Sequence, residues 1–158
     1  MVKRNFHGVQ INQSVTIVEK AGADVADIRN CIMKFDENGD VVVATDGTEA
    51  LLGIALIEAG YNDITGQESG KVVKGDDVDI QIKDMGVVVA GEAIKKGQEI
   101  TAGADGLAAV AAAGDFVLGV ALTGAEAGGF LRVLIAKYVK GATSGTAEDM
   151  VEEPDTTE

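Results

Sequence analysis

The stretch GDVVVATDGTEALLGIAL, residues 39–56, recurs in altered form as GLAAVAAAGDFVLGVAL, residues 106–122. With a one-residue gap, Gly39 aligns with Gly106, and Leu52-Gly53 aligns with Leu118-Gly119. Each copy reads as a strand, a short turn and an apolar strand that holds a glycine, as at a bulge or a close approach. Two copies are too few for a solenoid, which needs at least about three repeats. The pattern predicts one sandwich or barrel with an approximate internal duplication; the alternative is a chance match between Gly-, Ala- and Val-rich segments.

Short strands and tight turns are predicted on both sides of this stretch. Residues 77–83, DVDIQIK, alternate strictly and predict a half-buried strand with Val78, Ile80 and Ile82 on one face. The pair Asn38-Gly39 is typical of a type I′ hairpin turn. Further strands are predicted within residues 9–20, 31–35, 41–45, 50–59, 85–94 and 129–140.

The composition fits an all-β protein with a core of small side chains. Of the 158 residues, 46% are hydrophobic but only 4% are aromatic, so Val, Ile, Leu and Ala must build the core. The chain has 21 Gly and one Pro, and Gly supplies the positive φ that tight turns require. The prediction is a compact, Gly-rich β-barrel or sandwich.

Charge and segment composition divide the chain into three predicted regions. Residues 1–35 form an extended N-terminal segment, residues 36–140 the β-domain, and residues 141–158 a flexible tail with six acidic residues and no basic ones. The net charge of -13 argues against nucleic acid as a partner, because phosphate binding needs clustered Lys and Arg. No apolar run approaches the roughly 20 residues that span a bilayer, and the N-terminus does not read as a secretion signal.

The sequence offers little catalytic or metal-binding material. His7 is the only histidine and Cys31 the only cysteine, so a zinc site would need several carboxylates, and an internal disulfide is impossible. The acidic residues of 76–84 alternate with Val and Ile, which predicts the wet face of a strand rather than a calcium loop. We predict no catalytic residue, no metal site and no cofactor.

Lys95 is the one candidate for covalent modification. The run GEAIKKGQEI, residues 91–100, has the look of the lysine turn of biotin and lipoyl carriers, whose pattern is Glu-Ala-Met-Lys-Met. Here Ile94 and Lys96 flank the lysine. The simpler interpretation is a strand, a polar hairpin turn and a strand, with Ile94 and Ile100 inward and the lysines in water. The carrier function is the alternative hypothesis.

The ordered phrases of residues 39–140 resemble the family of phage capsid decoration proteins, also called head cement or head fibre proteins. The resemblance rests on GDVVVATDGTEALLGIAL, GDDVDIQIKDMGVVVAGEAIKKGQEITAGADGLAAVA and GDFVLGVALTGAEAGGFLRVLIA. It covers around two-thirds of the chain. It implies a β-tulip-like barrel, a non-enzymatic role, and homotrimers seated on the major capsid protein at the outer surface of the virion, after synthesis in the host cytoplasm.

The shell contact implied by this resemblance is expected in the basic N-terminal segment. Lys3 and Arg4 are predicted to meet acidic capsid surface and Phe6 to act as an anchor, whereas a frayed terminus is the alternative. The acidic tail is expected to point outward. A sugar-binding surface module is a third hypothesis, and it is disfavoured because two Tyr and no Trp provide few aromatic platforms.

Overall fold

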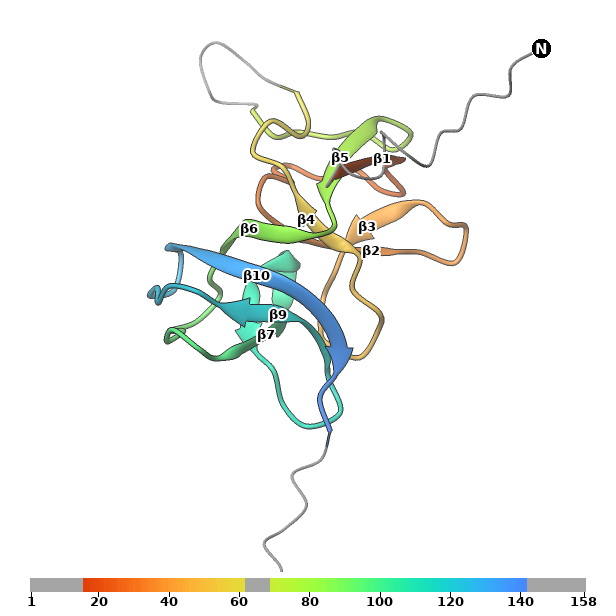
Figure 1. The fold of residues 1–158 in the computed structure, drawn as a ribbon. Coiled ribbons are helices and arrows are strands. Elements are labelled where there is room, and N and C mark those ends of the chain that lie inside the picture. The colour runs from red at the N-terminus through yellow and green to blue at the C-terminus, as the bar shows by residue number, and fades with distance from the viewer. Residues whose placement is uncertain (1–15, 62–68, 142–158) are drawn as a thin grey trace, which may run out of the picture.

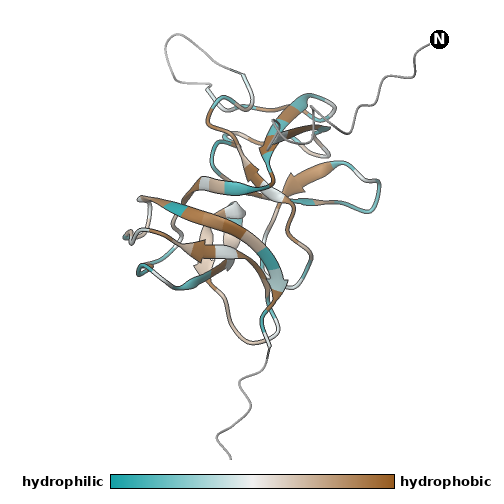
Figure 2. Ribbon diagram, in the orientation of Figure 1, coloured by the Kyte–Doolittle hydropathy of each residue, from teal (hydrophilic) through white to brown (hydrophobic). Residues whose placement is uncertain are grey.

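The computed structural model describes residues 16–61 and 69–141, which form ten β-strands and one 3-10 turn (Figure 1). They build two antiparallel five-stranded sheets, which confirms the all-β prediction. Figure 2 shows hydrophobic stretches on most of the strands and hydrophilic stretches in several of the loops. The elements are β1 (Thr16–Lys20), β2 (Ile32–Phe35), β3 (Val41–Val43), β4 (Gly53–Ala55), β5 (Asp77–Gln81), β6 (Asp84–Val89), β7 (Glu99–Ala102), the 3-10 turn (Ala104–Gly106), β8 (Ala108–Val110), β9 (Phe116–Ala121) and β10 (Phe130–Val139).

The two sheets have the same topology. The first sheet has the order β1-β5-β4-β2-β3 and the second has the order β6-β10-β9-β7-β8, so adding five to each label of the first gives the second. Backbone bonds outside the sheets repeat as well: Gly22 N donates to Val41 O, and Gly91 N donates to Ala108 O, both at 2.8 Å. The predicted internal duplication is therefore confirmed. We call residues 16–81 the first half and residues 84–139 the second half.

The register also repeats, and it defines which residues of the two halves are counterparts. One row of paired residues crosses each sheet at the same place. In the first sheet the row is Ile32, Ile54, Gln81 and Thr16. In the second sheet the row is Glu99, Val120, Leu134 and Met85.

Each half encloses a core of small aliphatic side chains, as the composition predicts. One core cluster lies wholly within the first half and contains ten buried residues, among them Met33, Val78 and Ile80. The core of the second half, with Ile100, Leu118 and Val133, also takes in residues of the first half. These are Ile32, Ala44, Leu51 and Ile54. The halves are therefore joined by continuous hydrophobic packing.

The glycine shared by the two repeated stretches sits where strands approach too closely for a side chain. A Cβ added at Gly53 would lie 2.1 Å from the carbonyl oxygen of Gln81. A Cβ added at Gly119 would lie 1.9 Å from the carbonyl oxygen of Leu134. This confirms the close approach that the sequence predicts at Gly53.

Two predicted turns differ from the structure. Residues 36–40 do join β2 and β3 in a hairpin, but Gly39 alone has a positive φ, +85°, whereas a type I′ turn also needs one at Asn38. The Asp36 carboxylate instead accepts bonds from the backbone N–H groups of Asn38 and Asp40. The predicted hairpin around Lys95 is wrong, because β6 and β7 are not neighbours: β10 and β9 lie between them.

Two strands of the first sheet, β1 and β2, fall within residues 1–35, the range predicted to be an extended N-terminal segment. β1 pairs with β5, and β2 pairs with both β3 and β4. The chain passes from the first sheet to the second between β5 and β6, at residues 82–83.

Candidate functional site

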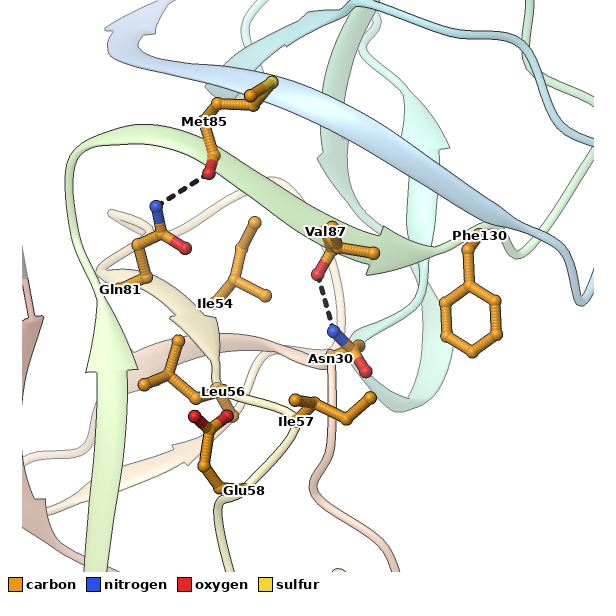
Figure 3. A pocket seen from close by; sticks show the side chains of 10 residues that line it. Asn30, Ile54, Leu56, Ile57, Glu58, Gln81, Met85, Val87 and Phe130 are labelled. Atoms are coloured by element: carbon orange, nitrogen blue, oxygen red, sulfur yellow. Dashed lines mark hydrogen bonds between the residues drawn. The ribbon is translucent and has the colours of Figure 1, made fainter.

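The seam between the halves is sealed by side chains of the first half that bind the edge of β6. Figure 1 shows β6 between the first sheet and β10. Asn30 Nδ2 donates to the carbonyl oxygen of Val87 at 3.0 Å, and Gln81 Nε2 donates to that of Met85 at 2.8 Å (Figure 3). An edge strand otherwise presents unpaired backbone groups. The two amides therefore fix β6 to the first half.

Asn30 stands in a turn that recurs in the second half, where Gly97 occupies the equivalent position. Asn30 has a φ of 58°, and its counterpart Gly97 has a φ of 90°. The Asn30 N–H donates to Ala55 O, and the Gly97 N–H donates to Ala121 O. Asn is among the few residues other than Gly that adopt this left-handed conformation readily. It keeps the turn while its amide reaches β6.

A pocket of about 290 Å³ opens along the seam. Apolar side chains line most of it, and the Asn30 and Gln81 amides lie at its wall (Figure 3). Its lining residues come from both halves: Asn30, Ile54, Ala55, Leu56, Ile57, Glu58, Gln81, Met85, Val87 and Phe130. A pocket of this kind can accept an apolar side chain of a partner.

Exposed hydrophobic side chains surround the pocket and continue over the second sheet. Ile57 and Phe130 are each 63% exposed, and Met85 is 49% exposed. Leu134 pairs directly with Met85 across β10 and β6 and is 47% exposed. The outer face of an antiparallel sheet is usually polar where water covers it. Apart from Arg132, which is exposed between Phe130 and Leu134 on β10, this face is apolar, as is typical of a protein contact surface.

A smaller adjoining pocket, which shares Asn30, Ile57 and Phe130 with the first, is lined by an ion pair. Arg29 grips Asp27 with two bonds, Nε to Oδ1 at 2.8 Å and Nη2 to Oδ2 at 2.7 Å. The hydrogen bonds from Arg29 hold the pKa of the Asp27 carboxyl below its usual value. The pair therefore adds little net charge beside the pocket.

The described residues contain no arrangement that suits metal binding or thiol chemistry. No group of three His, Cys, Asp or Glu residues within 16–61 and 69–141 is placed to hold a metal ion. Cys31 is buried, and burial raises the pKa of its thiol to about 11, so little thiolate forms near neutral pH. His7 lies outside the described residues. No helix in the part of the chain that the structure describes is long and apolar enough to cross a membrane.

Comparison with known proteins identifies the family. Residues 8–135 match the sequence model of the XM1 gp53 minor capsid protein, which is most of the chain. The chain belongs to the XM1 gp53 minor capsid protein family. Membership in this family makes it a phage capsid-associated structural protein, and the resemblance to decoration and head fibre proteins is confirmed.

A solved structure shares the fold of this XM1 gp53 family member. The N base of head fibre gp8.5 of bacteriophage phi29 superposes with a TM-score of 0.54 at 23% identity, over 77% of this chain and 93% of that chain. At this identity the likeness establishes the fold alone. The search of curated proteins gave no match.

The candidate site residues predicted from the sequence either do not line this pocket or lie outside the residues that the structure describes. Lys3, Arg4 and Phe6 lie outside the described residues. Lys95 and Lys96 are exposed, and Ile94 and Ile100 are buried, as predicted. The Lys95 turn is the counterpart of the Ile28–Asn30 turn in the first half, so the duplicated fold requires a turn there whether or not a lysine is present.

Proposed function

We propose that this protein binds the outer surface of a phage capsid as a homotrimer and stabilises the head, without catalysing a reaction. The match to a minor capsid family over residues 8–135 is the observation that carries the proposal. The apolar seam adds a surface suited to protein contacts. A trimer that holds three capsid subunits gains affinity through effective concentration, even when each contact is weak.

The N-terminal segment remains our candidate for the shell contact, through Lys3, Arg4 and Phe6. Its two cations can pair with acidic capsid surface, and Phe6 provides an apolar anchor of the kind that dominates binding energy. The whole chain has a net charge of -13. It therefore has few other basic clusters that could bind an acidic capsid surface.

The test is to mix the purified protein with expanded heads that lack decoration. We expect saturable binding at micromolar protein and a higher melting temperature of the heads. Replacing Lys3, Arg4 and Phe6 together by Ala should weaken head binding at least about tenfold, whereas replacing Lys95 and Lys96 by Ala should leave it unchanged. The control removes the same number of cations from an exposed turn. Failure of the wild-type protein to bind heads would refute the proposal.

The carrier hypothesis receives no support from the comparisons. In biotin carriers the lysine lies at the tip of a β-turn, whereas here the Lys95 turn links strands that are not paired. We expect the intact mass after co-expression with a biotin or lipoate ligase to equal that of the unmodified chain. A mass increase that disappears in Lys95→Arg would restore the carrier function.

A further inference from the structure

The first sheet has one face that the second half covers. Ile32 and Ile54 of this face are 0% and 2% exposed and belong to the core of the second half. Ile54 Cδ1 lies 2.7 Å from the place where a Cβ on Gly86 of β6 would stand. The Asn30 and Gln81 amides bind the β6 edge beside it. Within one molecule, this face of the first sheet therefore binds the edge strand of the second half, β6.

The second sheet presents the corresponding face, which is more exposed than that of the first sheet, although the side chains of Tyr138 and Lys140 bind Glu99 there. Val120 is the counterpart of Ile54 and is half-buried, and Leu134 is the counterpart of Gln81 and is 47% exposed. Glu99, the counterpart of Ile32, is held by Lys140 at 2.7 Å. The centre of the face is thus apolar, and its acid is already paired.

The first half carries the element that would cover such a face. β1 is the counterpart of β6, since both are the first strand of their half and both pair with the fifth. Among the described strands β1 lies at the edge of its sheet. Val18, the counterpart of Val87, is 57% exposed. One chain therefore holds both sides of the contact, but at opposite ends of the duplicated unit.

We propose that the outer face of the second sheet, around Val120 and Leu134, binds β1 of a second copy of this chain. The contact between copies repeats the contact between halves that each copy already contains. This inference rests on the proposed homotrimer and names its subunit interface. Because the two surfaces differ, the contact is heterologous, and a rotation that closes produces a ring.

Hydrophobicity and net charge fit this arrangement, whereas side-chain volume differs between the two contacts. Within the chain a large residue, Ile54, meets the smallest, Gly86. Between copies Val120 would meet Ile17, a bulkier pair than Ile54 with Gly86, so β1 would have to lie farther from this face than β6 lies from Ile54. A chain with a net charge of -13 repels its copies, so an apolar contact has to supply the attraction. Leu134 in place of Gln81 increases the apolar share of the contact.

Cross-linking between two single-cysteine variants tests the geometry. We would mix Val18→Cys protein with Leu134→Cys protein and add a short bismaleimide. We expect a covalent dimer in the mixture and little from either variant alone, because Cys31 is buried with a raised thiol pKa. Phe35→Cys is the matched control for Leu134→Cys, since Phe35 is 45% exposed and lies on the first sheet. Mixed with Val18→Cys, it should give no dimer.

Sedimentation separates this proposal from the proposed homotrimer. Leu134→Glu should raise the dissociation constant of the oligomer at least about tenfold, and Phe35→Glu should leave it unchanged. An oligomer that forms without the Val18–Leu134 cross-link and withstands Leu134→Glu would overturn this interface while leaving the homotrimer standing. A wild-type protein that sediments as a monomer at every concentration would overturn both.

Discussion

Gly119→Ala is expected to unfold the second half or to destabilise the protein by about 3 kcal/mol or more. The added Cβ would lie 1.9 Å from the carbonyl oxygen of Leu134, an atom of the neighbouring strand β10. A backbone atom cannot rotate away as a flexible side chain can. The strands β9 and β10 would have to separate, with loss of the hydrogen bonds and the packing between them. Urea unfolding followed by circular dichroism measures the loss.

Two further variants make this prediction specific. Gly53→Ala should be similarly damaging, because its Cβ would lie 2.1 Å from Gln81 O at the counterpart position. Gly141→Ala should change the free energy of unfolding by no more than about 0.5 kcal/mol, since nothing lies within 4 Å of its added Cβ. Equal stability of Gly119→Ala and Gly141→Ala would contradict the close strand approach described here.

These glycines also show how far the sequence predicts the fold. The alignment of Leu52-Gly53 with Leu118-Gly119 identified counterpart strands correctly, because both copies must solve the same packing problem. Alternation identified β5 for the same reason, since Val78 and Ile80 are both fully buried. Such patterns reflect which side chains of a strand are buried, so the sequence of the strand alone is enough to predict them.

Strand pairing is a different matter. The sequence around Lys95 predicts a hairpin, but β6 pairs with β10 instead. Nothing near residues 91–98 encodes that choice, which depends on contacts with residues 130–135. The type I′ prediction at Asn38-Gly39 was wrong because the Asp36 carboxylate stabilises another turn.

The seam was not predicted from the sequence, although one signal for it existed. Extending the repeat alignment upstream would have placed Asn30 opposite Gly97. An Asn at a position that otherwise takes Gly indicates a left-handed turn with a side chain left over for another bond. Gln81 gives no such signal, because a polar residue on the polar face of a half-buried strand is ordinary. Its role depends on where β6 lies.

Asn30→Asp is expected to cost about 2 to 3 kcal/mol of stability at pH 7. The substitution replaces an amide donor by a carboxylate that faces the carbonyl oxygen of Val87. The ionised form therefore loses the bond and meets another acceptor. The protonated form can donate, so the folded state should raise the pKa of the new carboxyl above the usual value of about 3.9.

The sign of the pH dependence follows from that raised pKa. A carboxyl whose pKa is higher in the folded state stabilises folding below its unfolded pKa, and that stabilisation is lost as pH rises through its folded pKa. The stability gap between Asn30→Asp and wild type should therefore narrow as pH falls toward 4. Asn30→Gly, which keeps the turn as Gly97 does, should cost only about 1 kcal/mol at every pH. A gap for Asn30→Asp that is independent of pH would contradict the role assigned to this amide.

We propose above that this duplicated β-protein binds the outside of a phage head. Cryo-electron microscopy of expanded heads, imaged with and without saturating protein, tests it most directly. We expect added density on the outer capsid surface, repeated at equivalent positions and large enough for three copies of the two-sheet body. Heads that show no added density, or density confined to the inner surface, would contradict it.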